Sequence, residues 1–423
     1  MGACIREFYI EYGQRWAVYE PGDTVTGYVG LSLDRPLYCD GISALFQGTA
    51  RTFWTEYDGN SSKQGKLGPT AYYQEKLLYR KTQSVWEHGS STGEVVKEAP
   101  PPLRSVLNTS GQYGLKLRSS EAKGRLEPGS YKWRFSFELP ADCLTSFEAG
   151  FAPGYIRHQV KAMILVGETI SKSVKELFSV VCPTDPSSLD RRVLEGQSVH
   201  GSLGSFLGSV ARKSQPQIDA TLSLIKSGFV PGEPILINLT ACGPGLKSIK
   251  RVLVSLVQTV VCYASDPEPR SKEIKHPVVT IASDVRKMIA KSCGDQAALL
   301  IDEPVYVPAV IPNFSEPEIL EVSYGLRAVL CRSKQKEVMA LEAPIWIGTV
   351  RVFPRLVNCQ AAAVESPIAP PPYDNLHADD PPTYEESVLG ASALANQSAD
   401  SDQAFRPLIP TYTFRRNVLW EEI

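Results

Sequence analysis

A short turn sequence occurs twice in this chain, 210 residues apart, and it constrains the fold more than any other feature. Pro21-Gly22-Asp23 stands before an alternating segment at 24–33, and Pro231-Gly232-Glu233 stands before another at 235–241. Proline sets φ and glycine permits positive φ, so each sequence predicts a tight turn that enters a strand. Along 24–33 every second residue falls on one face, which predicts a half-buried strand with Val25, Gly27, Val29, Leu31 and Leu33 inward.

The same offset aligns two further strands without a gap. Carried forward, it pairs Ile42, Ala44, Phe46 and Ala50 with Val252, Val254, Leu256 and Val260. Carried backward, it pairs Phe8, Ile10 and Tyr12 with Ile218, Ala220 and Leu222. One such turn match is common by chance, but three collinear strands in one register indicate that a whole domain has been duplicated.

Further alternating segments favour an all-β chain. Residues 131–139 and 320–328 alternate in the same way, and helical periodicity is weak throughout. A chain of 423 residues suits two or three domains. We therefore predict two tandem immunoglobulin-like β-sandwiches, at 5–183 and 213–355. The Gly- and Ser-rich segment 184–212 is predicted as a linker, and the polar stretch from Asp58 to Ser120 as extended loops.

The composition changes after residue 355. Residues 356–423 carry a net charge of -7, whereas the whole chain carries -2, so the preceding part carries about +5. The segment is rich in proline and poor in residues that build a core, which predicts a disordered tail. A chain this close to neutral lacks the strong positive field of a dedicated nucleic-acid binder. The positive folded part is compatible with peripheral contact with anionic membranes where its charges cluster.

The tail contains two P-P-x-Y motifs, which predict binding to WW domains. Adjacent prolines favour the polyproline II conformation that fits the aromatic slot of such a domain, and the tyrosine fits a second pocket. Two motifs so close together also predict avidity for a partner with several WW domains. The alternatives are a polar, proline-stiffened spacer, or a Y-x-x-Φ sorting signal at Tyr373. The WW-binding residues are Pro370, Pro371, Tyr373, Pro381, Pro382 and Tyr384.

Nothing in the sequence favours an enzyme, a cofactor or a metal site. The five histidines are dispersed, and no P-loop, G-x-S-x-G or H-E-x-x-H motif is present. His158 stands in an alternating segment, so we predict a core residue with satisfied hydrogen bonds rather than a catalytic base. The nine cysteines never form a C-x-x-C pair. With no long apolar segment and no secretory signal, the chain is predicted to be intracellular.

Together these segments resemble a known family. The chain carries PGDTVTGYV near its start, SFEAGFAPGYIRHQVKAMI from Ser146 to Ile164, GFVPGE from Gly228 to Glu233, APIWIGT from Ala343 to Thr349, and then the paired P-P-x-Y motifs. This arrangement resembles the arrestin-domain-containing proteins, or α-arrestins, which include the thioredoxin-interacting protein. The resemblance extends over essentially the whole chain.

The resemblance implies an arrestin fold and the role of an adaptor. Such a protein recruits WW-domain HECT-type ubiquitin ligases to membrane receptor or transporter cargo and promotes ubiquitylation, endocytosis and protein trafficking. It would be cytoplasmic and recruited to the plasma membrane and endosomes. Two alternatives are a retromer-like trafficking scaffold and a redox-regulated, thioredoxin-binding regulator acting through Cys293. The terminal segment from Phe405 to Ile423 is a further candidate docking peptide.

Overall fold

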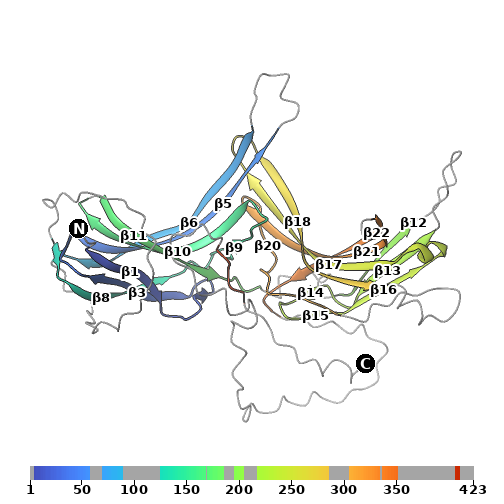
Figure 1. Cartoon of the computed structure of the whole chain (residues 1–423), viewed down its shortest axis with the longest axis horizontal. Coiled ribbons are helices and arrows are strands. Elements are labelled where there is room, and N and C mark those ends of the chain that lie inside the picture. Colours follow the sequence, from blue (N-terminus) through green and yellow to red (C-terminus); the bar gives the residue numbers. More distant parts are fainter. Residues whose placement is uncertain are drawn as a thin grey trace, which may run out of the picture. The chain divides into compact units, whose positions relative to one another are not determined.

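The computed structural model describes residues 4–57, 69–88, 124–167, 169–184, 195–203, 217–284, 304–333, 336–350 and 405–409. Most of these residues lie in β-strands, and none of them lies in an α-helix. The chain divides into two compact units (Figure 1). The first contains residues 1–182 together with 262–271 and 398–408, and the second contains the rest.

The first unit contains a three-stranded sheet and a larger sheet. The small sheet has the order β1 (Ile5–Tyr12), β3 (Thr24–Leu33), β8 (Gly129–Glu138). The large sheet has the order β2 (Val18–Tyr19), β11 (Thr169–Val180), β10 (Gly154–Val166), β5 (Gly41–Glu56), β6 (Thr70–Glu87), and β9 (Phe147–Glu148) pairs with β10. The short strands β4 (Leu37–Cys39) and β7 (Gly124–Leu126) pair separately.

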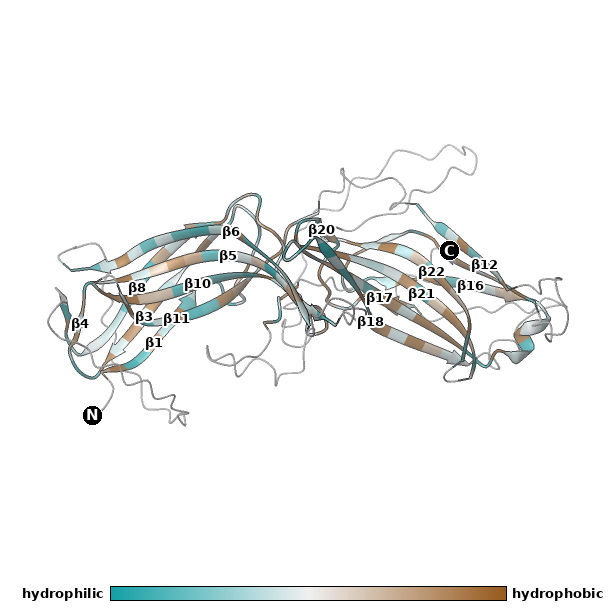
Figure 2. Cartoon of the chain, turned by 90° about the horizontal axis from the view of Figure 1, so that it is seen from above, coloured by the Kyte–Doolittle hydropathy of each residue, from teal (hydrophilic) through white to brown (hydrophobic). Residues whose placement is uncertain are grey.

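Aromatic side chains from both sheets form the core of this unit. Phe46 of β5 stacks on Phe137 of β8 with ring centroids 4.5 Å apart, and Tyr12 of β1 meets Phe178 of β11 edge-on. Hydrophobic and hydrophilic bands alternate along the strands (Figure 2), as one buried face and one exposed face require. The strand predicted at 24–33 is confirmed, and its buried residues include Val25, Val29, Leu31 and Leu33.

The second unit also contains a large sheet and a three-stranded sheet. Its large sheet has the order β14 (Gly228–Phe229), β22 (Lys336–Ile347), β21 (Leu320–Ser333), β17 (Arg251–Ala264), β18 (Arg270–Asp284), and β20 (Phe314–Glu316) pairs with β21. Its small sheet is β12 (Gln197–Leu203), β13 (Ile218–Leu224), β16 (Ile237–Cys242), while β15 (Pro234–Ile235) pairs with β19 (Val305–Tyr306). A 3-10 turn, Pro244–Ser248, follows β16.

The sheet orders confirm the predicted pair of tandem β-sandwiches. Strand β5 begins at Gly41 and β17 at Arg251, at the offset seen in the sequence. Gly22 has φ 85° and Gly232 has φ 92°, so both turns adopt the left-handed conformation that glycine permits. Each turn is followed directly by a strand, which is β3 in the first unit and β15 in the second.

The structure differs from the predictions at three places. Strand β12 lies inside the predicted linker 184–212. None of its residues is fully buried, and Val199 and Leu203 are its only large apolar residues, which is too weak a pattern to predict a strand. Strand β6 lies inside the predicted loop region 58–120 and is buried only at Tyr72 and Val85. Residues 405–409 belong to the tail that was predicted to be disordered, yet Phe405 and Ile409 are buried.

Candidate functional site

The residues predicted to bind WW domains lie outside the residues that the structure describes. These are Pro370, Pro371, Tyr373, Pro381, Pro382 and Tyr384. Cys293, the candidate redox residue, also lies outside them. The described part of the chain contains three features with polar or charged side chains that bear on function.

The first feature is a buried polar bridge at His158 on β10. Its Nε2 lies 2.9 Å from the carbonyl oxygen of Leu144, and its Nδ1 lies 3.0 Å from the hydroxyl of Tyr79 on β6. A carbonyl oxygen only accepts, so Nε2 donates, and Nδ1 of the neutral ring accepts from the tyrosine hydroxyl. Burial lowers the pKa of His158 to about 4. The prediction of a satisfied core histidine is confirmed.

The second unit contains a matching bridge. Tyr324 on β21 donates from its hydroxyl to the carbonyl oxygen of Ile311 at 2.6 Å. The side-chain amide of Gln258 on β17 donates to the same hydroxyl at 2.9 Å. Burial raises the pKa of Tyr324. Both bridges therefore use up their polar groups within the core, and neither presents an acid or base to a substrate.

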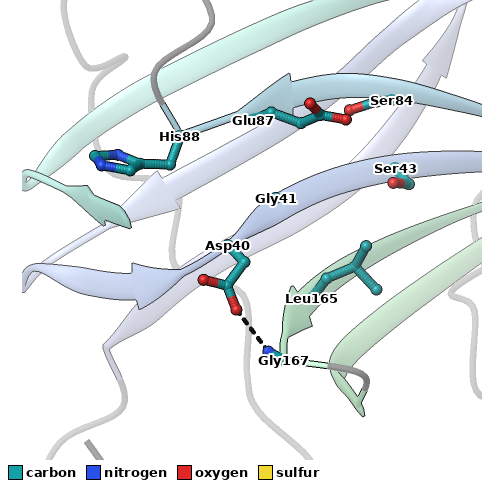
Figure 3. A pocket seen from close by; sticks show the side chains of 8 residues that line it. All are labelled: Asp40, Gly41, Ser43, Ser84, Glu87, His88, Leu165 and Gly167. Atoms are coloured by element: carbon teal, nitrogen blue, oxygen red, sulfur yellow. Dashed lines mark hydrogen bonds between the residues drawn. The ribbon is translucent and has the colours of Figure 1, made fainter. Parts of the chain in front are cut away.

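The second feature is a pocket of about 460 Å³ in the first unit, near the start of β5 (Figure 3). The carboxylate of Asp40 accepts a hydrogen bond from the backbone of Gly167 at 2.6 Å and so ties this corner to the β10–β11 turn. The His88 ring points away from the hydroxyls of Ser43 and Ser84 (Figure 3). A serine nucleophile needs a base within hydrogen-bond reach, so His88 is not oriented to act as a base for either hydroxyl.

The third feature is a concavity of about 440 Å³ beside the FAPGYIR segment. The guanidinium of Arg157 binds the carboxylate of Glu148 through two contacts of 2.6 and 2.5 Å, and it stacks over the ring of Tyr155. The hydrogen bonds to Glu148 raise the pKa of Arg157. Arg51 and the half-exposed ring of Phe53 line the same concavity. The surface combines a cation with aromatic rings and suits binding better than catalysis.

The cysteines of the described ranges are all free thiols. Burial raises the pKa of Cys39 and of Cys143 to about 12, so both remain protonated at neutral pH. No group of three or more His, Cys, Asp or Glu residues in the described part of the chain is placed to hold a metal ion. Within the same ranges, no helix is long and apolar enough to cross a membrane.

Two β-sandwiches with these sheet orders in one chain are typical of the arrestin class of folds. The arrestin (or S-antigen) N-terminal domain family matches residues 8–98 and 107–187, and the corresponding C-terminal domain family matches residues 214–352. The chain belongs to the arrestin-domain-containing proteins, the α-arrestins. Membership in this family indicates the role of a trafficking adaptor that binds cargo and trafficking machinery, and the family's members are not enzymes.

The chain is similar to two curated α-arrestins along much of its length. It is 23% identical over 335 residues to arrestin domain-containing protein 4 of Mus musculus, covering 78% of this chain and 69% of that protein. It is 27% identical over 277 residues to arrestin domain-containing protein 1 of Homo sapiens, covering 64% of this chain and 57% of that protein.

Sequence reasoning missed the partners inside these sites. The alternation around His158 indicated burial, but it carried no sign that Tyr79, 79 residues earlier, would meet it. Arg157 and Glu148 are nine residues apart, across the β9–β10 turn, and Arg157 lies diagonal to Glu148, which is paired with Tyr155.

Proposed function

We propose that this chain recruits WW-domain HECT-type ubiquitin ligases through its two P-P-x-Y motifs and brings them to membrane-protein cargo. The observation that carries the proposal is the pair of motifs within one acidic, proline-rich tail that follows two arrestin domains. The proposed place of action is the cytoplasm, with recruitment to the plasma membrane and endosomes. The ligase ubiquitylates the cargo, and this chain holds the ligase and the cargo close together.

The placement of lysine supports this division of roles. The last lysine of the sequence is Lys336, so the segment that holds the motifs offers no lysine for ubiquitin. A ligase bound there finds its acceptors on the folded units or on a bound cargo. The acidic tail also favours encounter with a basic WW surface through long-range attraction.

Binding of purified full-length chain to a tandem WW fragment of a HECT-type ligase tests the proposal. Titration with the parent, the Tyr373→Ala and Tyr384→Ala variants and the double variant measures each motif. Each single variant should bind more weakly than the parent, because avidity is lost, and the double variant should not bind. Tyr412→Ala removes a tail tyrosine outside both motifs and is the matched control.

The proposal is wrong if the double variant binds the tandem WW fragment as tightly as the parent does. Proximity labelling in cells with the parent and the double variant then identifies the cargo. Ligase peptides should disappear from the double variant, whereas cargo peptides should remain, because the folded units are unchanged. Loss of both sets together would place cargo binding in the tail instead.

A further inference from the structure

The pocket near the start of β5 has a row of side chains from which one is missing. Strands β10, β5 and β6 are neighbours in the large sheet, and their register aligns Leu165, Gly41 and Glu87 in one row. All three residues line the pocket (Figure 3). A Cβ atom at position 41 would lie 3.1 Å from the carbonyl oxygen of Trp86 and 3.7 Å from Cγ of Glu87. The glycine therefore leaves space in the pocket between Leu165 and Glu87.

A buried hydroxyl lies beside this space. Side chains alternate along a strand, so Ser43 is on the same face of β5 as Gly41, and it also lines the pocket. Ser43 is only 6% exposed, and its hydroxyl has no hydrogen-bond partner among the residues that the structure describes. Buried polar groups normally have a partner. A hydroxyl that is more than nine-tenths buried and lines a pocket therefore indicates a ligand with a polar group.

Two carboxylates give the pocket a negative charge. Asp40 lies directly before β5, and the hydrogen bond from the backbone of Gly167 holds its carboxylate in place (Figure 3). Glu87 is exposed, and no ion pair within the described ranges includes it. None of the described residues that line the pocket is Lys or Arg. Carboxylates that gather without a cation attract a positively charged ligand.

The kinds of side chain in the lining favour an ammonium group on an alkyl chain. An ammonium group donates three hydrogen bonds and accepts none, and two carboxylates and one hydroxyl offer three acceptors. The half-buried side chain of Leu165 supplies an apolar surface on the other side of Gly41 from Glu87. Alkyl stems pack along such surfaces while their charged ends remain among polar groups. The volume of about 460 Å³ is within the range of small-ligand pockets.

We propose that this pocket binds a primary alkylammonium group. The nitrogen binds between the carboxylates of Asp40 and Glu87, over the backbone of Gly41. It donates a third hydrogen bond to the Ser43 hydroxyl, and the alkyl stem packs against Leu165. A lysine side chain of a partner protein and a free polyamine both carry such a group. The binding does not depend on ligase recruitment, because every residue of the pocket belongs to the first unit.

Ligand-observed NMR with the full chain tests this proposal. The probe is Nα-acetyl-lysine N-methylamide, which should bind with a Kd on the order of 1 mM, as expected for a ligand of this size. Its Nε-acetylated form has the same stem without the charge and should not bind. Asp40→Asn keeps an acceptor for the N–H of Gly167 but removes the charge, and Glu87→Gln removes the other charge. Each variant should bind the probe roughly tenfold more weakly than the parent. Glu75→Gln makes the same change outside the pocket on β6, and this control should bind like the parent.

Equal binding of the charged and acetylated probes, or binding of neither, would overturn the proposal. Unchanged binding in both Asp40→Asn and Glu87→Gln would overturn it as well. A parallel titration with spermidine distinguishes the two sources of the group. Tighter binding of the lysine amide supports a partner's lysine as the ligand, and tighter binding of spermidine supports a polyamine. The Tyr373→Ala/Tyr384→Ala chain should bind the lysine amide like the parent, so failure here is distinct from failure of ligase recruitment.

Discussion

The two units anchor the same stretch of backbone with different side chains. In the first unit His158 on β10 donates to the carbonyl oxygen of Leu144, in the segment before β9. In the second unit Tyr324 on β21 donates to the carbonyl oxygen of Ile311, in the segment before β20. Strands β10 and β21 hold the same place in their sheets, so the hydrogen bond belongs to the architecture.

The second member of each bridge comes from a different strand. Tyr79 reaches His158 from β6, whereas Gln258 reaches Tyr324 from β17. Position 258 corresponds to Gly48 at the common offset, and the absent side chain of Gly48 leaves the space that Tyr79 and His158 occupy. Only the first bridge contains a histidine, whose pKa is lowered from its ordinary value of 6.5 to about 4, so acid sensitivity from the bridge is expected in the first unit.

The acidic residues of the turns before β3 and β15 also differ between the two units. Asp23 is exposed, and its carboxylate accepts a hydrogen bond from the backbone of Glu20 at 2.8 Å. The side chain of Glu233 is only 5% exposed and pairs with Lys226, while its other oxygen accepts from the backbone of Val230. The acidic side chain of the turn is therefore exposed in the first unit and part of a buried ion pair in the second.

The largest expected difference between the units follows from that ion pair. Lys226→Met removes the ammonium group that pairs with the buried carboxylate of Glu233 and should lower the free energy of unfolding of the second unit by about 4 kcal/mol. Asp23→Ala in the first unit should cost about 1 kcal/mol, because its turn is exposed. Hydrogen exchange resolved by unit, in rising denaturant, measures both losses.

Adding Glu233→Gln to the Lys226→Met chain provides the control. The neutral amide removes the buried negative charge, so part of the lost stability should return. Equal losses in Lys226→Met and Asp23→Ala would contradict the burial of the pair.

Acid should destabilise the first unit through His158, and this is the second largest effect. The pKa of His158 is lowered to about 4 in the folded chain from a usual value of 6.5. The unfolded chain takes up the proton first, so stability is lost as the pH falls from 6.5 to 4 and levels off below 4. The loss contributed by this residue reaches about 3 kcal/mol.

His158→Gln isolates this effect from the titration of carboxylates. The glutamine amide can donate to the carbonyl oxygen of Leu144 but takes up no proton in this range. The difference in stability between the parent and this variant should therefore change with pH between 6.5 and 4. A constant difference over that range would rule out His158 as the source.

A third effect distinguishes the bridge of the second unit. Tyr324→Phe keeps the ring but leaves the carbonyl oxygen of Ile311 and the amide of Gln258 without their partner. The second unit should lose about 2 kcal/mol of unfolding free energy. The loss should be the same at pH 4 and pH 7, and hydrogen exchange at both pH values checks this. A loss confined to acid would contradict the comparison.

The smallest effect is expected at Tyr79. Tyr79→Phe removes the hydroxyl that donates to Nδ1 of His158, but the hydrogen bond from Nε2 to the carbonyl oxygen of Leu144 remains. One neutral hydrogen bond is lost, so we expect a loss of about 1 kcal/mol in the first unit. Denaturant melts of the variant measure it, and a loss above that for Tyr324→Phe would reverse the expected order.

Sequence patterns predicted the strands that have one apolar and one polar face. The register of Ile42, Ala44 and Phe46 with Val252, Val254 and Leu256 corresponds to buried positions in both units. The conformation of the turn glycines could also be predicted from the sequence, because a turn position with positive φ favours glycine. Both signals are local or repeat at one offset, so a single sequence displays them.

What the sequence did not display was the choice of partner. Strand β12 has no fully buried residue, and its pairing with β13 depends on an open edge of that strand rather than on apolar pattern. The contact of Leu408 with Ser179 joins positions 229 residues apart. The alternation of apolar and polar residues along a strand shows which side chains are buried, but it does not show which segment covers them.

The limited space at Gly48 restricts which residues of the second unit can be substituted at the equivalent positions of the first. A Cβ atom there would lie 2.5 Å from the ring of Tyr79 and 3.1 Å from Nδ1 of His158. Introducing the glutamine of the second unit at this position therefore clashes unless Tyr79 and His158 change as well, and each of those changes alone breaks a hydrogen bond. The three positions are therefore coupled, because the cost of a side chain at position 48 depends on the residues at positions 79 and 158.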